Sequence, residues 1–256
     1  MNESLLISNL GRVRRLTLNR PDKRNALDAA LCRSLIEAVR EAASDRTVGA
    51  ILLDAEGKDF CSGMDLAEAL ETDQDEMLSL HQELFSIGGE LRKPMLAAVQ
   101  GAALAVGLGL ALGAHIVAAS TGARFGLTEV RIGLWPYVIF PVVAAAVGER
   151  KATELALTAR IVDLEEACRI GIVDVVVERG ALSEQAERIA SEMADGSATA
   201  VEQGLSFLQQ VVGLDPAAAA KLALKFRREA HASADFREGV LAFRRKRKPE
   251  WPSHAS

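Results

Sequence analysis

Short apolar runs alternate with stretches of helical periodicity through the first half of the chain. Residues 4–8 and 12–18 form the two arms of a predicted β-hairpin, and a helix with Asp28 as its N-cap follows them. Residues 48–54 and 95–99 are almost continuously apolar, which is typical of strands buried on both faces. The pattern therefore predicts recurring units of strand, turn and helix, and an α/β fold.

The second half of the chain is mainly helical. Six segments look helical, which are 151–158, 164–170, 182–193, 198–211, 216–230 and 235–245. In the third of them, Leu182, Ala186, Ile189 and Met193 recur on one face of a helix. No Pro/Ser-rich linker separates the two halves. We therefore predict a core over residues 1–196 and a helical C-terminal region over residues 197–256, packed on that core or on a neighbouring subunit.

One stretch has the length of a membrane span. Residues 94–123 contain no Asp, Glu, Lys or Arg, and about 20 apolar residues suffice to cross a bilayer. Gln100, His115 and several glycines interrupt this stretch, so we interpret it as a buried strand, a Gly-rich turn and a helix over residues 104–114. The apolar run at residues 5–7 is too short for a signal peptide, and we expect a cytoplasmic protein without a membrane span.

Composition narrows the class of protein. The 256 residues are 49% apolar and 25% charged, which is ordinary for a globular chain and rules out a mainly disordered one. A formal charge of −5 argues against a general nucleic-acid binder. The three cysteines are widely spaced and belong to no Cys/His cluster, so we expect reduced thiols and no metal site.

Two features carry candidate chemistry. The Gly-rich turn that begins at Gly101 leads into a buried helix, where free backbone N–H groups could hold an anion, although small residues also permit close helix packing. Glu129 stands between apolar neighbours and could move a proton. From spacing alone, however, we favour a surface acid paired with Arg124 or Arg131. Asp65 is interpreted as the N-cap of the next helix.

Four segments together resemble the crotonase superfamily, which is the enoyl-CoA hydratase/isomerase family. They are LTLNRPDKRNALD (16–28), AEGKDFCSGMDL (55–66), KPMLAAVQGAALAVGLGLALGAHIVAAS (93–120) and ARFGLTEVRIGLWP (123–136). The C-terminal FREGVLAFRRKRKPEWP resembles the usual ending of the family. The order and spacing match over nearly the whole chain. The five motifs in this order are much more specific for the family than for one reaction within it.

The resemblance implies a spiral of ββα units whose C-terminal helices build a homotrimer or a dimer of trimers. It implies an acyl-CoA thioester as substrate and no cofactor. The backbone N–H groups of Met64 and Val106 would form the oxyanion hole, and Glu129 would be the catalytic acid/base. The substrate-binding and CoA-binding residues would be Arg24, Ala26, Leu27, Leu66 and Trp135.

Departures from the family pattern bear on the reaction. Well-known hydratases use two glutamates, and Gly109 stands at the place of the first. The resemblance implies an enoyl-CoA hydratase, because that reaction is the commonest in the family. The single acid Glu129 makes a Δ3,Δ2-enoyl-CoA isomerase the alternative. Decarboxylation and thioester hydrolysis stay open, as does a CoA-binding homologue that has lost catalysis. Ala67 replaces a common phosphate-binding Lys, and Trp135, Tyr137 and Phe140 either reshape the acyl pocket or pack a subunit contact.

Overall fold

A twisted sheet forms the centre of the computed structural model, which describes residues 4–68 and 74–254. Six strands lie in the order β1-β2-β3-β4-β6-β8, with β1 antiparallel to β2 and every later pair parallel. Their bounds are β1 (Leu5–Leu10), β2 (Val13–Leu18), β3 (Ala50–Ala55), β4 (Met95–Val99), β6 (Ile116–Ser120) and β8 (Val175–Val177). The predicted hairpin and the predicted buried strands are confirmed.

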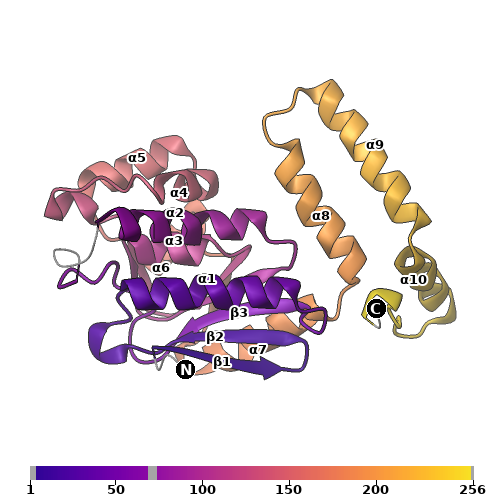
Figure 1. The fold of residues 1–256 in the computed structure, drawn as a ribbon, viewed down its shortest axis with the longest axis horizontal. Helices are drawn as coiled ribbons and strands as arrows, with labels where there is room; N and C mark the ends of the chain where they lie inside the picture. The colour runs from indigo at the N-terminus through magenta and orange to yellow at the C-terminus, as the bar shows by residue number, and fades with distance from the viewer. Residues whose placement is uncertain (1–3, 69–73, 255–256) are drawn as a thin grey trace.

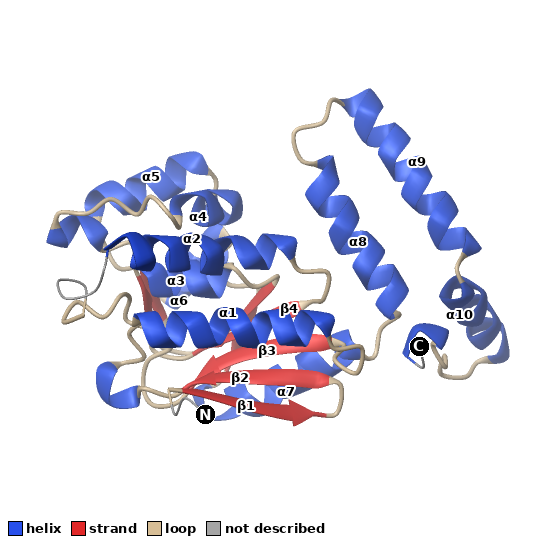
Figure 2. Cartoon of the chain, viewed as in Figure 1, coloured by secondary structure: helices blue, strands red, loops and turns tan. Residues whose placement is uncertain are grey.

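Helices cover both faces of this sheet (Figures 1 and 2). The helices of the core are α1 (Ala29–Ser44), α2 (Gln74–Glu90), α3 (Val106–Leu112), α4 (Phe140–Val147), α5 (Glu149–Thr158), α6 (Leu164–Ile170) and α7 (Leu182–Ala194). On one face, Leu16 and Leu53 pack with α1, α2 and α3 in the larger apolar cluster. On the other face, Leu52 and Leu96 pack against α7.

Helix α1 illustrates why these segments fold as they do. The Asp28 side chain accepts a hydrogen bond of 2.7 Å from the Leu31 N–H, which satisfies a free donor of the first turn. Leu31, Leu35 and Val39 recur along one face and are buried against the sheet. The predicted N-cap and the predicted inward face are both confirmed.

A second, two-stranded sheet was not predicted. Strands β5 (Ala102–Leu104) and β7 (Arg124–Gly126) are parallel, and each is three residues long, too short to show a period of two. The expected helix over 104–114 is therefore wrong at its start, because Leu104 ends β5 and α3 begins at Val106. The end of β5 and the start of α3 are therefore next to each other in the chain.

The C-terminal region is helical, as predicted, and consists of α8 (Ala198–Val211), α9 (Pro216–Ala232) and α10 (Ala234–Arg245). Helices α8 and α9 form a pair that projects from the core (Figure 1). The buried Asp235 fixes the base of this region, since it accepts hydrogen bonds from Ser197 and twice from Ser253. Trp251 adds a 2.8 Å hydrogen bond to the Asp195 carbonyl at the end of α7.

The charge-free stretch 94–123 folds as β4, β5, α3 and β6. Within the part of the chain that the structure describes, no helix has both the length and the apolar character to cross a membrane. The interpretation as separate buried elements is therefore confirmed.

Candidate active site

Three loop segments lie side by side beyond the carboxyl ends of β2, β3 and β4. The Leu27 N–H donates to the Gly63 carbonyl at 2.8 Å, and the Leu27 carbonyl accepts from the Asp65 N–H at 2.9 Å. The Arg24 carbonyl accepts from the Ser62 N–H at 3.0 Å. The segment predicted to bind CoA is thus held along the backbone that carries Met64.

The same backbone is tied to β5 on its other side. The Cys61 N–H donates to the Ala102 carbonyl, and the Cys61 carbonyl accepts from the Leu104 N–H, both at 3.0 Å. Ala105 in turn donates to the Gly126 carbonyl at 2.8 Å, which joins the end of β5 to the end of β7. Because β7 leads directly to Glu129, the structure brings the supports of the predicted catalytic residues together.

Two backbone N–H groups in this region have no acceptor among residues 4–68 and 74–254. Val106 is the first residue of α3, so its N–H has no partner inside the helix. Met64 forms an isolated parallel bridge with Leu27, in which Leu27 bonds to Gly63 and Asp65 on either side of Met64 and not to Met64 itself. Between the residues that the structure describes, neither N–H donates a hydrogen bond. Free, fixed donors of this kind can stabilise negative charge on a bound oxygen.

Backbone strain at Ala105 sets the direction of the Val106 N–H. Ala105 has φ 51° and ψ −128°, a conformation that costs a residue with a Cβ of order 1–3 kcal/mol. Close packing holds the start of α3 in place, since a Cβ on Gly107 would lie 2.4 Å from the Cys61 carbonyl oxygen. The sequence pattern gives no sign of this strain, because alanine is unremarkable at a predicted helix start.

Glu129 is a buried acid. Its exposed fraction is 7%, and neither carboxylate oxygen has a hydrogen-bond partner in the described part of the chain. Burial raises the pKa of Glu129, and the nearby backbone N–H groups of Thr128 and Glu129, which lie outside hydrogen-bonding geometry, oppose this shift. The surface ion pair favoured from spacing is therefore wrong, since Arg131 donates instead to the Ala159 carbonyl at 2.5 Å.

Gly109, which the resemblance places at the position of the first of two acids, faces a filled space. A Cβ on Gly109 would lie 2.4 Å from Cγ2 and 2.8 Å from Cβ of Ile139, which is fully buried. Ile139 is β-branched and stiff at χ1, so it cannot easily move aside. Ile139 therefore occupies the volume that a side chain at position 109 would need.

A salt-bridge clamp holds the edge of the site. Arg20 forms ion pairs of 3.0 Å with both Asp28 and Asp65, and it donates to the Ala26 carbonyl at 2.5 Å. The interpretation of Asp65 as a helix cap is wrong for the described residues, because its Oδ1 accepts from the Ala67 N–H in a loop. Its partner Arg20 holds the pKa of Asp65 below its usual range against the opposing effect of burial.

The remaining predicted ligand-binding side chains differ in exposure. Arg24 is 56% exposed and forms a 3.0 Å ion pair with Asp59, and Leu66 is 52% exposed. Trp135 is partly buried against the core, with its ring centroid 6.1 Å from that of Phe140. Tyr137, by contrast, is 76% exposed. The pocket-shaping role of Trp135 stays a prediction.

A buried imidazole, which the sequence pattern does not reveal, lies near Gly109. His81 on α2 is 4% exposed, and its Nε2 has no partner among the described residues. Its ring centroid is 5.7 Å from that of Phe85, whose Cδ1 would lie 3.5 Å from a Cβ on Gly109. Burial lowers the pKa of His81 to about 4, so the ring is neutral near pH 7.

A cysteine nucleophile and a metal site have less support in this region. Burial raises the pKa of Cys61 to about 12, so the thiol stays protonated and is a poor nucleophile. Within residues 4–68 and 74–254, no group of three or more His, Cys, Asp or Glu side chains could hold a metal ion. The buried carboxylate of Glu129 and the free N–H groups of Met64 and Val106 therefore stay the candidate chemistry of this region.

Comparison with known proteins gives consistent matches along the chain. The sequence model described as Enoyl-CoA hydratase/isomerase matches residues 10–254. A Rhizobium meliloti (strain 1021) protein named as an enoyl-CoA hydratase is 36% identical over 251 residues, covering 97% of this chain and 98% of that protein. The 2,3-dehydroadipyl-CoA hydratase of Escherichia coli (strain K12) is 32% identical over 249 residues, covering 96% and 98%.

Solved structures agree with the sequence matches. The crystal structure of an enoyl-CoA hydratase from Mycobacterium smegmatis has a TM-score of 0.91 and 30% identity to this chain, with 97% of this chain and 98% of that chain covered. The α/β class predicted from the sequence is thereby confirmed.

Proposed function

The chain belongs to the enoyl-CoA hydratase/isomerase family, and we propose that it adds water to a 2-enoyl-CoA thioester. The observation that carries this proposal is the buried, unpartnered carboxylate of Glu129 in a site that also offers the free N–H groups of Met64 and Val106. Such an arrangement suits a reaction in which negative charge develops on a thioester oxygen while a proton moves nearby.

The proposed hydration is balanced with one carboxylate. Glu129 takes a proton from water as the water oxygen bonds to C3, and the C2–C3 π electrons move onto the thioester oxygen as an enolate. The Met64 and Val106 N–H groups hold this oxyanion, and one such donor is worth about 3 kcal/mol of transition-state stabilisation. When the enolate collapses, protonated Glu129 returns a proton to C2. No cofactor beyond the CoA of the substrate takes part.

A second reaction is favoured by the contact between Gly109 and Ile139. Isomerisation of a 3-enoyl-CoA needs no water and one acid/base: Glu129 removes a proton from C2 and returns it to C4 of the dienolate. Because Ile139 fills the space beside Gly109, a second acid cannot orient water from that position. The Δ3,Δ2-enoyl-CoA isomerase is therefore the runner-up, and a CoA-binding protein without catalysis is the alternative from another class.

Absorbance assays distinguish these functions. We expect the purified protein to hydrate a 2-enoyl-CoA, which removes the conjugated enoyl absorbance, and to isomerise a 3-enoyl-CoA, which creates it. Hydration faster than isomerisation supports the hydratase, and the reverse order supports the isomerase. Absence of both reactions, together with CoA binding by calorimetry, would identify the non-catalytic homologue.

We also propose that the 24–27 segment contacts CoA. Ala26 and Leu27 are buried beside Met64, where their backbone could line the channel of a thioester, and the exposed Arg24 could reach a phosphate. Arg24 already pairs with Asp59, so a CoA phosphate would share or replace that partner.

The C-terminal region leads us to propose a homotrimer or a dimer of trimers. Helix α9 has no buried residue, and large apolar side chains of this region are exposed, among them Leu208, Leu224, Phe236 and Phe243. Exposed apolar surface of this extent is characteristic of protein–protein contacts. We expect light scattering to give a mass of at least three chains of 27.4 kDa at micromolar concentration. A monomeric mass would contradict this proposal.

A further inference from the structure

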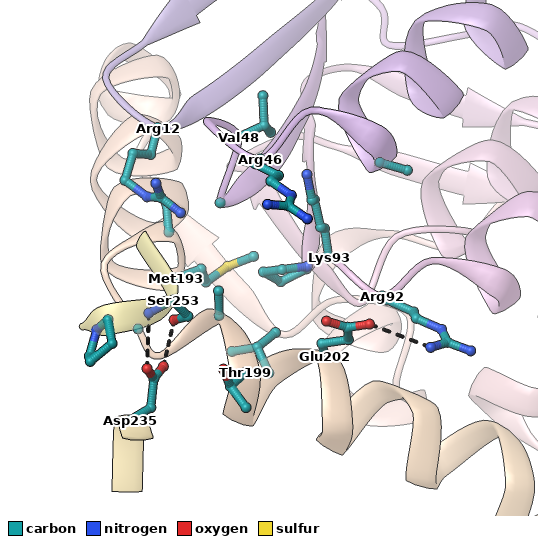
Figure 3. Close-up of a pocket in the computed structure, with 18 of the residues that line it drawn as sticks. Arg12, Arg46, Val48, Arg92, Lys93, Met193, Thr199, Glu202, Asp235 and Ser253 are labelled. Carbon is teal, nitrogen blue, oxygen red and sulfur yellow. Dashed lines mark hydrogen bonds and ion pairs between the residues drawn. The ribbon is translucent and has the colours of Figure 1, made fainter. Parts of the chain in front are cut away.

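A cavity of about 490 Å³ lies between the core and the C-terminal region (Figure 3). Its walls include Arg12, which precedes β2, Val48, which precedes β3, and Lys93, which precedes β4. These residues lie at the amino ends of the parallel strands. The candidate active site lies beyond their carboxyl ends, so the cavity is at the opposite edge of the sheet. A volume of this size is typical of small-molecule sites.

The wall of this cavity is cationic. It contains four cationic side chains, Arg12, Arg46, Arg92 and Lys93, and two carboxylates, Glu202 and Asp235. Three of these six groups have charged or polar partners of their own: Arg92 pairs with Glu202 at 3.4 Å, and Asp235 accepts from two serines.

The ammonium group of Lys93 also has hydrogen-bond partners within the protein. Its Nζ donates to the carbonyls of Ala42 and Asp45 at the end of α1. Arg12 and Arg46 are different, because neither has an ion-pair partner among the described residues. The Nε of Arg12 is in addition buried and has no acceptor in the part of the chain that the structure describes. Figure 3 shows that both side chains reach toward the cavity from the core, with Thr199 and Glu202 on the facing wall.

Helix α8 contributes further donors to the facing wall. Ser197 caps the Ala200 N–H, but the N–H groups of Ala198 and Thr199 donate no hydrogen bond between described residues, and both residues line the cavity. The start of a helix carries a partial positive charge. Met193 and Val201 add apolar surface between these polar groups.

We propose that this cavity binds a small organic anion, with its oxyanion group paired to Arg12 and Arg46 and its apolar part against Met193 and Val201. Guanidinium groups pair with phosphate and carboxylate in the same forked geometry, so the ligand is a phosphate monoester or a carboxylate. Arg12 and Arg46, which form no ion pair with a described residue, and the free N–H groups opposite them point to the same kind of ligand. The inference does not depend on the acyl-CoA reaction.

Calorimetric titration at low ionic strength tests this proposal, with phenyl phosphate and benzoate as matched probes. We expect one saturable site per chain for at least one probe, and the tighter probe identifies phosphate or carboxylate as the preferred group. The double variant Arg12→Ala/Arg46→Ala should weaken binding at least about tenfold, as expected for the loss of charge-assisted hydrogen bonds. Arg188→Ala, which removes an exposed arginine of α7, is the control and should leave binding unchanged.

Three outcomes would overturn the proposal. The first is that neither probe binds the wild-type protein. The second is equal affinity in the folded double variant, for which an unchanged circular dichroism spectrum and melting temperature serve as the check. The third is loss of probe binding in Arg24→Ala, because the probe would then occupy the candidate active site.

Discussion

Glu129→Gln should lower the rate of the enoyl-CoA reaction by about 10²–10⁴-fold, the usual contribution of a general acid/base. The substitution keeps the shape of the side chain and removes its ability to exchange a proton. Binding of an acyl-CoA should change little, since the proposed donors at Met64 and Val106 are backbone groups. Glu165→Gln, an exposed acid at the start of α6, is the control and should retain the wild-type rate.

The pH profile gives an independent check on Glu129. Burial raises the pKa of this carboxyl, so the ionised form needed for proton abstraction is lost on acidification at a higher pH than for an ordinary glutamate. We expect the acid limb of kcat/KM to lie above pH 4.5 in the wild type and to be absent from the residual activity of Glu129→Gln. A full rate in this variant would remove Glu129 from the mechanism.

Much of the fold can be predicted from the sequence because its longer elements have strong local signals. Helix α1 has both an N-cap at Asp28 and a repeating apolar face, and these agree with each other. Strands β5 and β7 could not be predicted, because their pairing depends on residues that are 22 positions apart, such as Ala102 and Arg124. Three residues contain no periodicity from which such a pairing can be inferred.

The candidate site shows the same limit. Only the family resemblance indicates the backbone donors of Met64 and Val106, because backbone N–H groups have no side-chain signature. Glu129 stands out from its apolar neighbours, but its catalytic role also comes from the resemblance. The burial of Glu129 depends on how its loop packs, so spacing alone favoured an exposed ion pair. Ile139 gave no signal either, since it lies 30 residues beyond Gly109 in the chain and meets it only in the folded structure.

The contact between Gly109 and Ile139 predicts that replacing this glycine by alanine destabilises the protein, which is the opposite of the usual effect in a helix. In an open helical position, Gly→Ala stabilises a protein by roughly 0.5–1 kcal/mol. At Gly109 the new Cβ would overlap Ile139, and overpacking of this kind costs typically about 1–3 kcal/mol. Urea denaturation should therefore show a lower free energy of unfolding for Gly109→Ala. Gly204→Ala in α8, where a Cβ meets nothing within 4 Å, should be stabilising.

A double-mutant cycle assigns this cost to Ile139. Ile139→Ala alone should lower the free energy of unfolding by about 2–5 kcal/mol, because it leaves a cavity at a fully buried position. Adding Gly109→Ala to that variant should no longer be destabilising, since the new methyl group enters vacated space. The destabilisation of the double variant should then be smaller than the sum of the two single destabilisations by roughly 1–3 kcal/mol. Strict additivity would mean that Ile139 does not set the limit on side-chain size at position 109, and that the missing second acid needs another explanation.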